Sequence, residues 1–312
     1  MSDHWRIAFM GTPGPAAATL EALLKGPDPV AGVVTQPDRP AGRGQQSVKS
    51  PVRRLAEASG IPVVAPERIR DPGFLDTLAG WSPDVIVVVA YGRILPRSIL
   101  ELAPQGCINV HYSLLPKYRG AAPIPWAIMN GEERSGVTTM RLVEKMDAGP
   151  IFLQQEVFLS KDETTASLTE KMVPVGTGLL LETIARLKAG EISARAQPEE
   201  GVTFAPMIKK EDGAINWNEP ASASERRVRA FSPWPSAYLY WRGKLLKIHR
   251  AAVVATERHG APGEVLRADA GGLWVATSSG ALSLEEVQLE NRNRLPAAEF
   301  LKGARIKKGE RL

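Results

Sequence analysis

The sequence predicts an α/β fold, a doubly wound Rossmann-like parallel sheet followed by a small β-barrel domain. Short apolar segments alternate with helical ones over roughly the first 190 residues, as in strand–helix–strand units. Residues 84–90 are almost all apolar and β-branched, which is typical of a central parallel strand. From about residue 207, short alternating segments are separated by glycine and proline turns. The 312 residues are enough for two domains.

The first domain is expected to span residues 1–189. Its predicted strands are 5–10, 30–35, 63–64, 84–90, one beginning at Gly106, 137–143 and 151–159. Its predicted helices are 16–24, 51–59, 73–79, 96–102 and 164–189. The last helix should break or bend near Pro174 and Gly176. The glycines after the first strand do not complete a dinucleotide or phosphate-loop fingerprint, so we assign no nucleotide cofactor.

Residues 36–50 interrupt this alternation. They carry glycines, prolines and the cations Arg39, Arg43 and Lys49, with little apolar content. A fifteen-residue segment without secondary structure is uncommon, and is usually functional or disordered. A functional loop and a plain mobile surface loop both stay open from the residues alone.

The second domain is expected at 207–312, after a linker at 190–206. A helix is predicted at 222–230, followed by strands at 237–241, 245–251, 263–267, 273–276 and 281–289. Five short strands suggest a small barrel. Residues 201–312 hold 18 Lys and Arg against 12 Asp and Glu, which favours a polyanionic partner there, although many basic domains bind none.

Composition excludes several classes of protein. The only cysteine, Cys107, leaves no disulfide within the chain and no cysteine-based metal site, as in a reducing cytoplasm. The four histidines lack zinc-like spacing, so we predict no metal. We find no secretory signal, and the apolar runs are too short to span a bilayer. We therefore expect a cytoplasmic protein without membrane contact, and a monomer.

The candidate site centres on residues 106–150. Asn109 and His111 are two apart in an apolar strand, so both side chains should face one side near the strand's carboxyl end. Ligands of open α/β sheets collect at that edge. An amide, an imidazole and the later carboxylate of Asp147 could stabilise an oxyanion and manage a proton in acyl transfer. An isolated N-x-H could equally satisfy the backbone of a turn.

Longer motifs favour the catalytic interpretation. They are GTP at the start, TQPDRPAGRG, VVVAYG, N-x-H-x-S-L-L-P, RGAAPI, G-V-T, D-A-G-P and FSPWP, in this order. The sequence resembles the folate-dependent formyltransferases over nearly its whole length, most closely those that act on initiator methionyl-tRNA. The resemblance implies 10-formyltetrahydrofolate as formyl donor, the α-amine of methionine on that tRNA as acceptor, a role in translation initiation and an OB-like second domain that binds tRNA.

The resemblance also implies roles for individual residues. Asn109, His111 and Asp147 would be catalytic, and the 36–50 loop would enter the acceptor end of the tRNA through Arg39, Arg43 and Lys49. Folate contacts would come from Ser113, Leu114, Leu115 and Pro116 and from the main chain of Arg93, Ile94 and Leu95 and of residues 143–146.

Two positions depart from the family pattern. Tyr112 stands where a small residue is usual, and Pro15 replaces an aromatic residue that would line the aminoacyl pocket. Two alternatives also remain: a folate formyltransferase acting on a small amine, which would share Asn109, His111 and Asp147, and an RNA-binding protein that keeps a relict catalytic fold.

Overall fold

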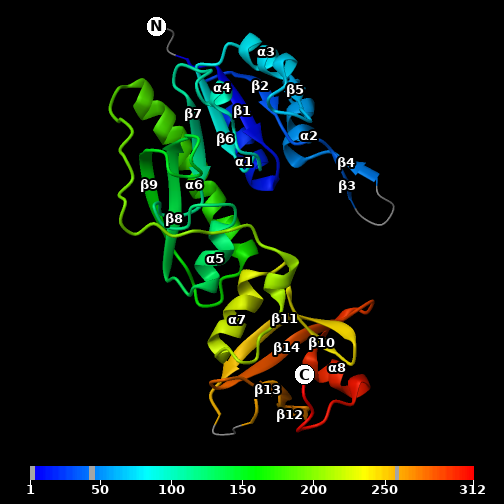
Figure 1. Ribbon diagram of the computed structural model, residues 1–312. Coiled ribbons are helices and arrows are strands. Elements are labelled where there is room, and N and C mark those ends of the chain that lie inside the picture. Colours follow the sequence, from blue (N-terminus) through cyan, green and yellow to red (C-terminus); the bar gives the residue numbers. More distant parts are fainter. Residues whose placement is uncertain (1–3, 42–45, 257–259) are drawn as a thin grey trace. The chain divides into compact units, whose positions relative to one another are not determined.

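The computed structural model describes residues 4–41, 46–256 and 260–312 (Figure 1). Contacts divide the chain into two compact units. The first contains the chain up to Pro123, with Arg134–Phe158 and Thr169–Pro206. The second contains Ile124–Glu133, Leu159–Leu168 and Met207–Leu312. The domain limits predicted at residues 189 and 206 stay predictions.

A seven-stranded sheet forms the centre of the first unit, in the order β5-β2-β1-β6-β7-β8-β9. The strands are β1 (Ile7–Gly11), β2 (Val30–Val34), β5 (Val63–Val64), β6 (Val85–Val89), β7 (Cys107–His111), β8 (Arg134–Arg141) and β9 (Ile151–Phe158). The first five in sequence are parallel, whereas β8 and β9 are antiparallel to their neighbours. The predicted fold class is confirmed, with an antiparallel edge added to the parallel sheet.

Helices cover both faces of this sheet. On one face, α3 (Pro72–Gly80) and α4 (Arg97–Leu100) bury side chains against β1, β6 and β7. On the other, α1 (Gly14–Leu24) and α6 (Thr165–Lys188) are joined by the Thr19 and Thr177 hydroxyls, 3.2 Å apart. The helix α2 (Pro51–Ala58) lies against α1. The strand order reverses between β1 and β6, so a ligand crevice is expected outside their carboxyl ends.

Three local predictions are corrected. The segment 36–50 contains a short antiparallel pair, β3 (Arg39–Ala41) with β4 (Gln46–Val48), in which Arg39 pairs with Val48 and Ala41 with Gln46. Helix α6 runs from Thr165 to Lys188 without a break at Pro174, so the break is corrected, whereas the bend stays a prediction. The helix α5 (Pro123–Met129) was not predicted.

The second unit is built on an antiparallel sheet in the order β10-β11-β14-β13-β12, with β15 beside β14. Its elements are a 3₁₀ turn (Lys210–Gly213), α7 (Ala221–Ala230), β10 (Ala237–Trp241), β11 (Lys244–Val254), β12 (Val265–Asp269), β13 (Gly272–Ala276), β14 (Ala281–Leu289), β15 (Arg294–Pro296) and α8 (Ala297–Ala304). Helix α8 buries Phe300 edge-on against Trp241 of β10, with ring centroids 5.7 Å apart.

Within the described ranges, no helix combines the length and apolar character that crossing a membrane requires.

Candidate active site

Asn109 lies inside β7 and faces the same side of the sheet as His111, as predicted. Its Cα pairs with that of Val88, close to the carboxyl end of the neighbouring strand β6. Only 9% of Asn109 is exposed. No residue in the described part of the chain forms a hydrogen bond with its side-chain amide. A nearly buried amide without a partner is costly, so this group is free to donate to a ligand.

His111 ends β7, and the following loop fixes its ring. The Nε2 atom lies 2.9 Å from the carbonyl oxygen of Tyr118. Because a carbonyl can only accept, Nε2 carries the proton and the neutral ring has its lone pair on Nδ1. Nδ1 lies 3.7 Å from Asp147 Oδ2, and both side chains are largely buried. The structure therefore brings the predicted imidazole and carboxylate together.

Asp147 is held in the loop after β8 in a left-handed conformation, with φ of 47°. Its Oδ2 accepts a hydrogen bond of 2.7 Å from the backbone N–H of Gly120. Gly120 has φ of 129°, and a Cβ there would collide with the carbonyl oxygen of Ala205. Only glycine fits at residue 120 without displacing the backbone that orients the carboxylate.

The loop after β7 is tightly bonded to β8. Ser113 Oγ donates to the Lys117 carbonyl at 2.6 Å, and Thr138 Oγ1 donates to the Ser113 carbonyl at 2.6 Å. The Leu115–Pro116 peptide is cis, and Leu115 is 3% exposed. Ser113 and Leu115 are thus interior residues that shape this turn, whereas Leu114 and Pro116 are partly exposed.

The second predicted folate segment follows β6. The Arg93 guanidinium is engaged by the carbonyls of Pro66 and Glu67 and by Gln36 Oε1, at 2.9 to 3.1 Å. Leu95 is buried in the core, while Ile94 is 67% exposed. Because the Arg93 side chain already bonds Gln36, Pro66 and Glu67, a ligand could contact this segment only through its main chain and the Ile94 side chain.

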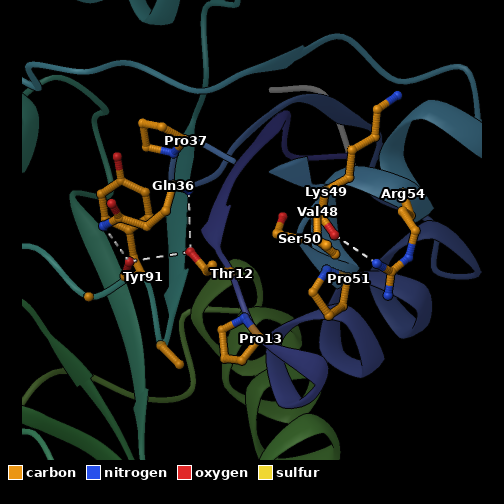
Figure 2. Close-up of a pocket in the computed structure, with 12 residues that line it drawn as sticks. Thr12, Pro13, Gln36, Pro37, Val48, Lys49, Ser50, Pro51, Arg54 and Tyr91 are labelled. Carbon is orange, nitrogen blue, oxygen red and sulfur yellow. Dashed lines mark hydrogen bonds between the residues drawn. The ribbon is translucent and has the colours of Figure 1, made fainter. Parts of the chain in front are cut away.

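A cavity of about 630 Å³ lies at the carboxyl ends of β1, β2 and β6 (Figure 2). Its wall is largely apolar, and the polar lining is bonded internally. Gln36 Nε2 donates to the Tyr91 carbonyl at 3.0 Å, and Arg54 Nη1 donates to the Lys49 carbonyl at 2.7 Å (Figure 2). The lining residues are Thr12, Pro13, Gln36, Pro37, Val48, Lys49, Ser50, Pro51, Arg54, Ala90, Tyr91 and Gly92. Asn109, His111 and Asp147 are not among the residues that line it.

The predicted tRNA contacts lie around this cavity only in part. Lys49 lines it, and the Lys49 ammonium pairs with Glu57 at 2.6 Å. Arg39 belongs to β3, and Arg43 lies outside the described residues.

The structure shows where the side chains of Tyr112 and Pro15, the two departures from the family pattern, lie. Tyr112 faces away from His111, toward Gly176 of α6, where a Cβ added to the glycine would lie 3.3 Å from the tyrosine ring. Its bulk therefore does not narrow the His111 side of the sheet. Pro15 stands in the first turn of α1, and its neighbour Pro13 lines the cavity instead.

The sequence pattern of the formyl transferase family matches residues 5–184, a stretch that includes Asn109, His111 and Asp147. The chain belongs to the formyl transferase family. The pattern of the formyl transferase C-terminal domain matches residues 207–305 of the same enzyme, where the antiparallel sheet lies.

This formyl transferase has relatives of almost equal length. A methionyl-tRNA formyltransferase of Magnetococcus marinus is 47% identical over 308 residues, covering 99% of this chain and 98% of the relative. A methionyl-tRNA formyltransferase of Desulfotalea psychrophila is 50% identical over 301 residues, covering 96% and 93%.

Solved structures share the fold of this formyl transferase at low identity. HypX from Aquifex aeolicus, in complex with tetrahydrofolic acid, is 22% identical with a TM-score of 0.62, over 96% of this chain and 48% of HypX. The sugar 3N-formyl transferase WlaRD is 18% identical with a TM-score of 0.67, over 93% of this chain and 99% of WlaRD.

Several residues of the enzyme's crevice were not singled out from the sequence. Arg54 lies one turn after the helix start that Ser50 and Pro51 signal in the sequence. That signal could have placed Arg54 in the first turn of α2, at the edge of the crevice. Arg119 belongs to the RGAAPI motif, which drew attention to the segment without assigning its arginine a role. Gln197 lies in the predicted linker and carries no motif.

Proposed function

We propose that the enzyme transfers a formyl group from 10-formyltetrahydrofolate to the α-amine of methionine on initiator methionyl-tRNA. The observation that carries this proposal is the 44–50% identity, over nearly the full chain, to relatives named methionyl-tRNA formyltransferase. The agreement extends over both the catalytic and the second domain. The alternative of a small amine substrate is not favoured.

The geometry of the Asn109 site suits this reaction. The neutral amine forms a bond to the formyl carbon, and the negative charge that develops on the formyl oxygen is stabilised by the free amide of Asn109. His111, with its Nδ1 facing Asp147, assists by accepting a proton or by stabilising charge as an imidazolium. The carbon–N10 bond then breaks, the amine nitrogen loses one proton, N10 gains one, and tetrahydrofolate leaves.

The formyl donor is proposed to lie against the loops after β6 and β8. Ile94, Val143 and Met146 are exposed apolar side chains on these loops, which is the lining that a planar ring needs. The main chain of residues 93–95 and 143–146 would supply its polar contacts. Ser113, Leu114, Leu115 and Pro116 would hold the adjoining turn.

The acceptor end of the tRNA is proposed to enter the cavity at the ends of β1 and β6. Pro13, Pro51 and Tyr91 give it an apolar wall that fits a methionine side chain. Lys49 lines this cavity, and Arg39, Arg43 and Lys49 would contact phosphates or bases of the tRNA. The second domain, with its positive excess, would bind the body of the tRNA. We propose a monomeric enzyme of the cytoplasm.

The test is formylation of purified initiator tRNA charged with methionine, with 10-formyltetrahydrofolate as donor. Uncharged tRNA, free methionine and an amino sugar nucleotide serve as controls. Formylmethionine released from the tRNA is the expected product. Formylation of the sugar amine without formylation of the charged tRNA would overturn the proposal.

A further inference from the structure

A segment from Arg195 to Ala205 runs along both loops that form the Asn109 site. Arg195 and Ile151 exchange two backbone hydrogen bonds, of 2.7 and 2.8 Å, beside the loop that carries Asp147. Arg119 donates its N–H to the Thr203 carbonyl at 2.9 Å, and Ala205 donates to the Arg119 carbonyl at 2.8 Å. Two loops that are distant in sequence are therefore joined through one segment.

Gln197 is the side chain in this segment that reaches both loops at once. Its Nε2 donates to the carbonyl oxygens of Asp147 at 2.8 Å and of Gly149 at 2.7 Å. Its Oε1 accepts two hydrogen bonds from Arg119, from Nε at 3.1 Å and Nη2 at 2.7 Å. The amide thus connects the backbone that carries the Asp147 carboxylate to the guanidinium of Arg119.

The chemistry of these contacts selects glutamine. Two carbonyl acceptors need two donors, and a guanidinium needs an acceptor, which one amide supplies together. Arg119 is only 8% exposed, and no carboxylate in the described part of the chain pairs with it. Its hydrogen bonds polarise the Gln197 amide and strengthen the two donors on the opposite side.

The held backbone has little freedom of its own. Asp147 already occupies a left-handed conformation, and a Cβ at Gly149 would collide with the Arg141 carbonyl oxygen. Such a conformation persists only where the surroundings fix it. Both carbonyls that flank Ala148 bond to Gln197, so this one side chain sets the orientation of the turn.

We propose that Gln197 and Arg119 are positioning residues that hold the Asp147 carboxylate beside His111. The proposal rests on the formyl transfer proposed above, in which Asp147 acts through His111. Neither residue touches the reacting atoms. Their effect is exerted entirely through the placement of the carboxylate.

The test is a double-mutant cycle between Gln197→Leu and Asp147→Asn, read as single-turnover formylation rates. Misplacement of a catalytic group by about 1 Å costs about 100-fold, so Gln197→Leu should lower the rate by about 10- to 100-fold with KM nearly unchanged. In the Asp147→Asn background the same change should lower the rate less than about 2-fold, because the group it positions is already lost. Equal fold-losses in both backgrounds, or no loss from Gln197→Leu alone, would overturn the proposal.

A second substitution separates positioning from folding. Gln197→Glu keeps the side chain's size and its attraction to Arg119, but it turns an acceptor toward the Asp147 and Gly149 carbonyls. We expect a melting temperature close to that of the wild type, and a rate loss that also vanishes in the Asp147→Asn background. Gln155→Glu, on the exposed part of β9, makes the same chemical change as a control and should leave the rate unaltered. A Gln197→Glu enzyme with the wild-type rate would contradict the proposal.

The activity of the wild type separates failure of the proposed function from failure of the positioning role. If the wild type formylates a different amine and not methionyl-tRNA, the proposed function fails, and the same cycle is measured with that amine. If the wild type formylates methionyl-tRNA but the cycle shows additive losses, only the positioning role fails.

Discussion

The Oδ2 atom of Asp147 accepts a hydrogen bond of 2.7 Å from the backbone N–H of Gly120 and lies 3.7 Å from Nδ1 of His111. The first contact fixes the carboxylate, and the second keeps it close enough to act on the imidazole ring by charge. Hydrogen bonds of catalytic groups are often longer before the substrate is bound. The carboxylate is therefore in place before the amine arrives.

Asp147→Asn should lower turnover strongly while folate binding survives. The asparagine oxygen can still accept from Gly120, so the loop is kept, but the negative charge beside His111 is lost. We expect a fall of about 100-fold or more in the single-turnover rate, as when an orienting carboxylate is neutralised. Asp162→Asn, at an exposed position, is the matched control. A variant with a near-normal rate would remove Asp147 from the mechanism.

Asn109→Ala tests the oxyanion contact. Removal of one preorganised donor costs about 100- to 1,000-fold in turnover. The donor's dissociation constant, measured by fluorescence or calorimetry, should change little, because the amide acts on charge that develops later. The exposed Asn293→Ala is the control. Equal losses in folate binding and in turnover would instead make Asn109 a binding residue.

We expect Cys107 to be a structural residue. Burial raises the pKa of its thiol to about 12, and its Sγ lies 3.6 Å from the Ile99 carbonyl. The folded protein should therefore resist iodoacetamide at pH 8 and react once unfolded. Cys107→Ala should keep most of the activity, and a folded but inactive variant would contradict this role.

The raised pKa also fixes the direction of a pH effect. Since an unfolded thiol titrates near about 8.5, the contribution of Cys107 to the free energy of unfolding is complete below that pH. It is lost as the pH rises toward about 12. The free energies of unfolding of wild type and Cys107→Ala can be measured by urea unfolding at pH 7.5 and pH 10. Relative to the wild type, the alanine variant should be more stable at pH 10 than at pH 7.5.

Arg43→Ala probes the segment between β3 and β4. A residue that guides the acceptor end should matter more for placing the amine than for overall tRNA affinity, since misplacement by about 1 Å can cost about 100-fold. We expect a larger loss in single-turnover rate than in tRNA binding. The exposed Arg70→Ala serves as the control. An Arg43→Ala variant that changes neither quantity would mean that this segment is an ordinary surface loop.

The sequence predicted the elements that carry strong periodicity or long motifs. The apolar strand around Asn109 and His111 and the β-branched run 85–89 are fully buried strands, as their composition requires. The pair β3–β4 was missed because its residues are polar and turn-forming, so pairing across the loop decides its structure. Gln197 was missed because its role depends on two loops some 50 and 78 residues away in sequence.

The central claim is that the Asn109 site formylates methionine on initiator tRNA. The most direct measurement is a competition in which wild type and Asn109→Ala receive 10-formyltetrahydrofolate with equal concentrations of charged initiator tRNA and an amino sugar nucleotide. The formylated products are then identified by mass spectrometry. We predict formylmethionyl-tRNA as the dominant product of the wild type, and a rate about 100- to 1,000-fold lower for the variant. Formylation of the sugar nucleotide in preference to the tRNA, or equal rates for the two enzymes, would contradict the account.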